Sequence, residues 1–104
     1  MSKEKSEDEI RNEFLSHVRH LVKYWGNLKD KNCEEKLSGL AFSILSAIDG
    51  SSVNLCGFIL APCPHEDDKQ YHIDKGDDYY PQNHESNVKC DIAGSLHELF
   101  YEKI

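Results

Sequence analysis

Residues 6–26 read "SEDEIRNEFLSHVRHLVKYWG", and this stretch decides how the chain begins to fold. Its apolar residues recur every three or four positions, which is typical of one stripe along a helix. They are Ile10, Phe14, Val18, Leu21 and Trp25. Ser6 and Glu9 have the spacing of a capping box, in which each side chain satisfies a free backbone donor of the other residue. The pattern predicts a helix from a cap at Ser6 to about Trp25, and Gly26 suits its C-terminal end.

A second helix is predicted over residues 32–50, "NCEEKLSGLAFSILSAIDG". Asn32 and Glu35 repeat the capping spacing, and Gly50 can take the left-handed conformation that ends a helix. The apolar face is broad, so we expect this helix to be the most buried element. It comprises Leu37, Leu40, Ala41, Ile44, Leu45 and Ile48. Because a link of only six mostly polar residues, 27–32, separates the two helices, an antiparallel hairpin is expected.

In the second half of the chain, the sequence patterns change from those typical of helices to those typical of strands. Residues 52–61, "SVNLCGFILA", are rich in strand formers and are followed by Pro62 and Pro64, and residues 69–74, "KQYHID", alternate apolar and polar side chains. Asp91 can cap a last helix with an apolar stripe of Ile92, Leu96, Leu99 and Phe100. We therefore predict an α+β fold in which two or three short antiparallel strands are covered by helices. Residues 1–104 would form one domain, with 1–5 as a frayed tail.

The net charge of the chain and its distribution restrict the kinds of partner that we expect. The net charge is −7. Residues 1–50 contribute −1 and residues 51–104 contribute −6. Such a chain repels phosphate backbones, so direct nucleic-acid binding is not expected, whereas a protein partner with a basic surface is. No segment resembles a secretion signal or a membrane span. We accordingly expect a cytoplasmic protein whose four cysteines are reduced.

Residues 61–74, "APCPHEDDKQYHID", concentrate side chains that bind metals or transfer protons. The run from Pro64 to Asp68 resembles the A-H-P-D-D-E motif of zinc-dependent de-N-acetylases, with Glu66 at a position where that motif has proline. The resemblance implies that His65 and Asp68 bind zinc and that Asp67 acts as the base. Zinc would lower the pKa of a bound water and so supply a nucleophile.

A structural metal site is a second interpretation of the same segment. Cys63, His65, Asp68 and His72 offer sulfur, nitrogen and oxygen ligands, and His84 or Cys90 could complete the set. The alternative is that the cysteines are small core residues and the histidines lie in loops. On the first predicted helix, Glu13, His17 and His20 share one surface, which is either a metal site or a plain polar face.

The stretch from Glu66 to Asp91 holds eight acidic residues and three lysines. It is either a solvated loop or an interaction surface on which tyrosines, which are enriched in binding hot spots, stand among carboxylates. The predicted surface consists of His65, Glu66, Asp67, Asp68, Tyr71, His72, Asp77, Asp78, Tyr79 and Tyr80.

The C-terminal two thirds of the chain resembles a group of small uncharacterised bacterial and phage proteins. Their pattern G-F-x-L-x-P-x-P-H-x-x-D-K-x-Y-H followed by A-G-x-L-H-E-x-F is matched by "GFILAPCPHEDDKQYH" at 57–72 and "AGSLHELF" at 93–100. The resemblance implies a phage-type or prophage-type accessory protein, many of which inhibit a host protein by binding it.

The leading hypothesis is a small acidic protein that acts by protein–protein contact and needs no cofactor. The alternative is a metal-binding protein or zinc-dependent hydrolase centred on His65, Asp67, Asp68 and His72, so enzymatic activity stays open. The sequence also leaves open the oligomeric state and the identity of the partner.

Overall fold

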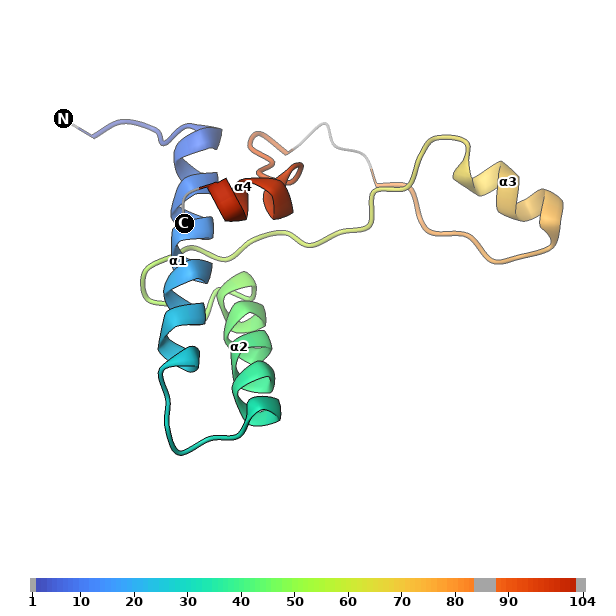
Figure 1. The fold of residues 1–104 in the computed structure, drawn as a ribbon. Coiled ribbons are helices and arrows are strands. Elements are labelled where there is room, and N and C mark those ends of the chain that lie inside the picture. Colours follow the sequence, from blue (N-terminus) through green and yellow to red (C-terminus); the bar gives the residue numbers. More distant parts are fainter. Residues whose placement is uncertain (1, 84–87, 103–104) are drawn as a thin grey trace. The chain divides into compact units, whose positions relative to one another are not determined.

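The computed structural model describes residues 2–83 and 88–102, which contain four helices (Figure 1). These are α1 (Glu7–Gly26), α2 (Cys33–Ile48), α3 (Asp68–Lys75) and α4 (Leu96–Glu102). The chain forms two compact units. We call residues 1–58 with 90–104 the hairpin unit, and residues 59–89 the α3 unit.

The two N-terminal helices begin where their capping boxes predict. The Glu9 amide donates to Ser6 Oγ at 3.1 Å, and the Ser6 amide donates to Glu9 Oε1 at 3.0 Å. Asn32 and Glu35 make the same reciprocal pair, at 2.8 and 2.9 Å. Each box satisfies backbone donors that a helix start otherwise leaves free. The predicted antiparallel hairpin of α1 and α2 is confirmed (Figure 1).

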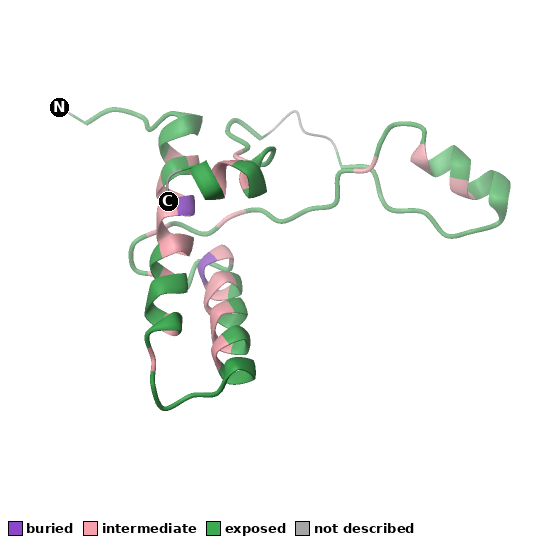
Figure 2. Ribbon diagram, in the orientation of Figure 1, coloured by how far each residue is buried: buried purple, intermediate pink, exposed green. Residues whose placement is uncertain are grey.

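A stripe of small residues on α2 lets the two helices approach closely. Trp25 from α1 lies over Gly39, and its Nε1 donates to Ser43 Oγ at 3.0 Å. Among the described residues only Leu15 and Ala47 are buried, at 4% and 1% exposure (Figure 2). The fully buried core of the hairpin unit is therefore small, with one residue from α1 and one from α2.

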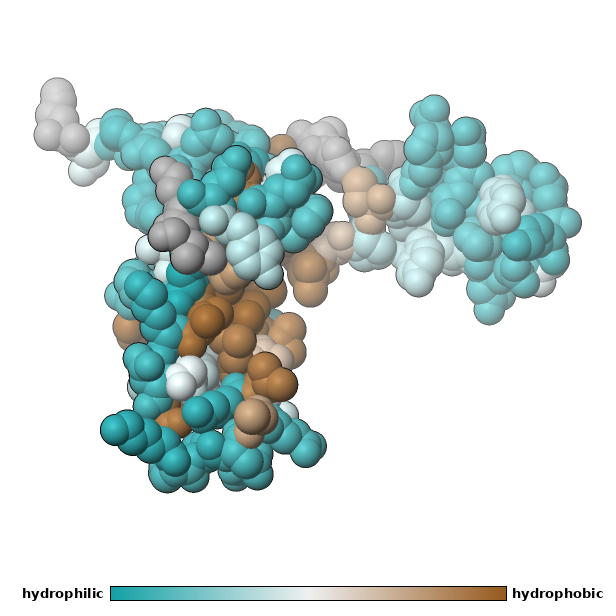
Figure 3. Space-filling view, viewed as in Figure 1, coloured by the Kyte–Doolittle hydropathy of each residue, from teal (hydrophilic) through white to brown (hydrophobic). Residues whose placement is uncertain are grey.

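The expectation that α2 would be the most buried element is wrong. Leu37 is 67% exposed and Leu45 is 57% exposed, and Phe42 beside them is 72% exposed. The reason is that Trp25 of α1 packs against Gly39 and Ser43, while the face that carries Leu37, Phe42 and Leu45 is left open within the hairpin unit. Figure 3 shows apolar side chains gathered over this hairpin.

Residues 49–58 form a closed loop rather than the first predicted strand. The Phe58 amide donates to the Ile48 carbonyl at 2.9 Å, which brings the two ends of the loop together. Gly50, at φ 91°, and Gly57 lie so close that a Cβ on either would be 3.1–3.3 Å from the other's Cα. The Phe58 ring packs edge-on against the Phe14 ring, and the two ring centres are 5.2 Å apart.

The α+β prediction is wrong, because the described residues contain helices and no strand. Residues 52–61 meet another backbone only at the closure of the loop, where the Phe58 amide donates to the Ile48 carbonyl, and Val53 is 99% exposed. Residues 69–74 lie inside α3. A lone extended segment gains no ladder hydrogen bonds, so alternation alone does not make a strand.

The C-terminal segment is held on α1 by two arginines. Arg11 Nε donates to the Ile92 carbonyl at 2.9 Å, and Arg19 donates to the carbonyls of Leu99 and Phe100, each at 2.9 Å. The Arg19 guanidinium also lies 5.7 Å from the centre of the Phe100 ring. Such bonds satisfy carbonyls that the last turn of a helix leaves without partners.

The last helix begins later than predicted. Asp91 does not cap it, because Asp91 Oδ1 accepts from the Ala93 amide at 3.0 Å in a local turn. Gly94 and Ser95 then have positive φ angles of 103° and 56°, which a helix interior does not allow. The helix starts only at Leu96, so Ile92 contributes to the contact with α1 from outside α4.

No helix in the described part of the chain is both long enough and apolar enough to cross a bilayer.

Candidate functional site

The predicted interaction segment lies in the α3 unit and is built around one short helix. Gly76 ends α3 in the left-handed conformation at φ 78°, and the Asp77 amide donates back to the His72 carbonyl at 2.9 Å. Side chains four apart reinforce the helix: Gln70 donates to Asp74 at 2.9 Å and Lys75 donates to the Tyr71 hydroxyl at 3.2 Å. These contacts join residues one helical turn apart, so they favour a helix at residues 69–74 although the sequence alternates as a strand does.

The segment that carries α3 is closed at its base by two amide side chains. Asn83 Nδ2 donates to the Pro62 carbonyl at 3.0 Å, and Gln82 Nε2 donates to the Glu66 carbonyl at 3.2 Å. We call residues 62–83 the clasped loop. Its two arms are therefore joined within the α3 unit, 16 and 21 residues apart in sequence.

The tyrosines of the clasped loop are accessible and lie beside lysines. Tyr71, Tyr79 and Tyr80 are 56%, 47% and 63% exposed. Lys75 Nζ lies 4.9 Å from the Tyr71 ring centre, and Lys69 Nζ lies 5.3 Å from that of Tyr79. Such cation–π contacts orient the rings. Tyr80 has no such lysine in the described contacts and is the most exposed of the three.

Acidic groups surround these rings. Residues 59–89 hold seven acidic side chains against three lysines. The Asp67 side chain is 86% exposed and Asp77 and Asp78 are also exposed, whereas the Asp68 side chain is only 27% exposed. The predicted surface residues from His65 to Tyr80 thus lie in one compact unit, and most of their side chains are open to solvent.

The residues predicted to bind metal form two pairs rather than one cluster. His65 Nδ1 lies 3.6 Å from Asp67 Oδ2, and His72 Nε2 lies 3.3 Å from Asp68 Oδ1 across one turn of α3. Within residues 2–83 and 88–102 no group of three or more metal-binding side chains comes together. Cys63 is exposed, and His84 lies outside the described residues. Zinc binding here stays a prediction.

The Asp68–His72 pair is the more enclosed of the two. Asp68 Oδ2 and His72 Nδ1 are shielded from solvent and have no hydrogen-bond partner in the described part of the chain. Unpaired polar atoms of this kind are costly. The two side chains are 26% and 27% exposed as a whole, so the pair is partly open to solvent.

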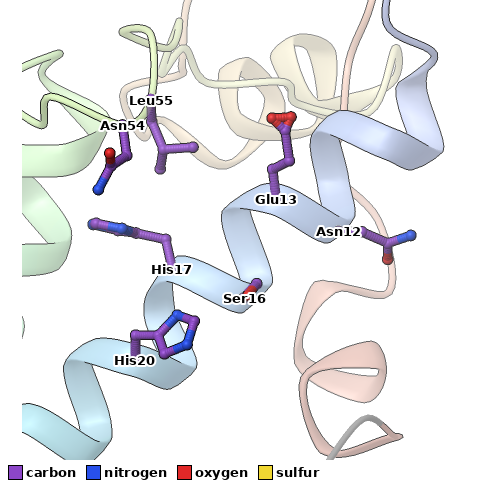
Figure 4. A pocket seen from close by; sticks show the side chains of 7 residues that line it. All are labelled: Asn12, Glu13, Ser16, His17, His20, Asn54 and Leu55. Carbon is purple, nitrogen blue, oxygen red and sulfur yellow. The ribbon is translucent and has the colours of Figure 1, made fainter.

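A second feature lies in the hairpin unit, along α1. A hollow of about 410 Å³ is lined by Asn12, Glu13, Ser16, His17, His20, Asn54 and Leu55 (Figure 4). The shared surface of Glu13, His17 and His20 is thus present. The sequence did not predict that the loop at residues 49–58 lines this hollow, because residues 52–61 were expected to form a strand. Gly50 and Gly57, whose backbones lie close together, were the available signal.

The hollow has little remaining charge. Both carboxylate oxygens of Glu13 accept from Lys5 Nζ, at 2.7 and 2.8 Å. The hollow therefore presents imidazole, amide and hydroxyl groups beside apolar surface that includes Leu55, a mixture that does not mark one ligand class.

Comparison of the chain with protein-family models, with curated proteins and with solved structures gives no match.

Proposed function

We propose that this protein binds a protein partner with a basic surface, through the acidic, tyrosine-bearing clasped loop. The observation that carries the proposal is the combination of three exposed tyrosines with a net excess of carboxylates in one closed segment. Tyrosine supplies large contact area at low entropic cost, and carboxylates steer and orient a basic partner.

The charge of the chain supports the same class of partner. The α3 unit carries seven acidic residues and three lysines, whereas residues 1–50 are nearly balanced. Long-range attraction of a basic protein would therefore favour encounter at this unit. If the resemblance to phage-type proteins holds, the partner is a host protein whose basic groove the loop occupies.

A matched pair of charge reversals tests the proposal. D77K/D78K and D30K/E34K each change the net charge from −7 to −3, and all four side chains are exposed. The probe is a lysine- and arginine-rich peptide titrated into labelled protein and followed by NMR. We expect shifts confined to residues 65–80, and binding that D77K/D78K weakens roughly tenfold more than D30K/E34K does.

A second variant addresses the tyrosine component. Tyr80→Ala removes the most exposed ring and leaves the charge unchanged, so it should weaken the same complex without altering its salt dependence. If D77K/D78K and D30K/E34K bind the peptide equally well, the attraction depends only on net charge, and the proposed site is refuted.

A further inference from the structure

One face of α2 has an uncharged surface that no other described part of the hairpin unit covers. Residues 37–48, "LSGLAFSILSAI", contain no charged side chain over about three turns. A helix that is uncharged all round is normally buried on all sides. In the hairpin unit, however, α1 covers only one side, and Leu37, Phe42 and Leu45 remain 57–72% exposed.

The open face has a regular pattern of small and large residues. Its centre consists of Ser38, Ala41, Phe42 and Leu45, all exposed. Successive members of this set are three, one and three positions apart, and residues with such spacings lie along one seam between paired helices. We propose that this face binds the same face of a second copy of the chain, with the two α2 helices antiparallel.

The pattern fits a second copy because it is complementary to itself. A two-fold axis that passes between residues 41 and 42 brings Phe42 opposite the partner's Ala41, and Leu45 opposite the partner's Ser38. Each large side chain then meets a small one, as close packing requires. An isologous interface repeats each of these contacts twice. A foreign partner would not require the sequence to have this symmetry.

Charge and area limit the strength of this association. Two chains of charge −7 repel each other, and the same axis brings Glu34 opposite the partner's Asp49 at each end of the seam, whereas residues 37–48 between them carry no charge. The three large side chains expose on the order of 400 Å² per copy, so burying them on both copies, with the small residues between them, removes roughly 800–1,000 Å² in total. That value is at the lower end for specific interfaces, so we expect a dimer that dissociates on dilution.

Sedimentation velocity on the full chain tests the proposal over about 1–100 µM. The wild type should move from monomer to dimer across this range. Phe42→Glu should weaken association by about 100-fold or more, because it places a carboxylate in the seam. Leu60→Glu is the matched control, since Leu60 is 81% exposed and lies outside the hairpin unit. A wild type that stays monomeric throughout overturns the proposal, as does equal behaviour of the two variants.

A size exchange tests the register. Ala41→Leu enlarges an exposed residue, so the monomer should fold normally, but the new side chain would meet the partner's Phe42 and weaken the dimer about tenfold. Adding Phe42→Ala in the same chain reverses the large and small positions and should restore much of the association. If Ala41→Leu has no effect, the proposed axis is wrong. The D77K/D78K variant should dimerise like wild type, which separates this proposal from that of the clasped loop.

Discussion

The indole ring of Trp25 occupies the space that a side chain at Gly39 would need. An ideal Cβ at residue 39 would collide with three carbon atoms of the ring, and the same indole is tied to Ser43 by its Nε1. The contact between α1 and α2 therefore depends on a residue that has no side chain.

Gly39→Ala should destabilise the hairpin unit by about 1 kcal/mol, because displacing the ring outweighs the gain in helix propensity. Urea unfolding and the fluorescence of the single tryptophan report the free energy and the ring's environment. Gly26→Ala is the control, since nothing lies within 4 Å of its Cβ position. Equal stability of the two variants would show that the ring moves aside without cost.

Ser43→Ala removes the acceptor of the Trp25 indole. We expect a loss of about 1 kcal/mol in the free energy of unfolding, beyond the effect of exchanging serine for alanine in a helix. Ser16→Ala on α1 measures that propensity effect by itself, because no hydrogen bond from its hydroxyl is seen among the described residues. The difference between the two variants is the quantity to compare, and a value near zero would argue against the bond.

Acid should weaken the start of α1 in a defined pH range. A hydrogen bond from Lys3 and then those from Ser6 hold the pKa of Glu9 down, from 4.5 to about 2. The ionised carboxylate therefore contributes stability that is complete above pH 4.5 and is lost as the pH falls towards 2. In Glu9→Gln this part of the pH dependence should be absent when helix content is followed by circular dichroism. An identical acid profile in the variant would contradict the assignment.

Arg19→Ala should release the C-terminal segment without unfolding the α1–α2 hairpin. The substitution removes two hydrogen bonds to the carbonyls of Leu99 and Phe100, as well as the contact with the Phe100 ring. Amide exchange in α4 should accelerate by tenfold or more, while exchange in α2 stays near the wild-type rate. Lys23→Ala, which removes a cation from the same helix, should leave both rates unchanged. Uniform acceleration across α1, α2 and α4 would mean that Arg19 stabilises the whole unit instead.

The sequence predicts the helices that carry their own start and stop signals. Ser6 with Glu9, and Asn32 with Glu35, fix the beginnings of α1 and α2 through contacts within one turn. Such signals act locally, so they can be read without knowing the rest of the fold. Gly50 likewise has the positive φ expected at the end of α2.

The sequence did not predict α3 or the face of α2 that is covered. Six alternating residues at 69–74 fit a strand or a helix equally well, and the contacts between side chains four apart favour the helix. Which face of α2 is covered depends on where Trp25 lies. Sequence reasoning located the acidic segment, but it could not foresee that His65 and His72 each pair with a different aspartate.

The arginine contacts at residues 92, 99 and 100 also determine when the hairpin unit can be completed during synthesis. A ribosome makes the segment that Arg11 and Arg19 hold about eighty residues after it makes these two arginines. The whole α3 unit is synthesised in between. The first helix can therefore receive this last neighbour only after the α3 unit has been made, which delays completion of the hairpin unit.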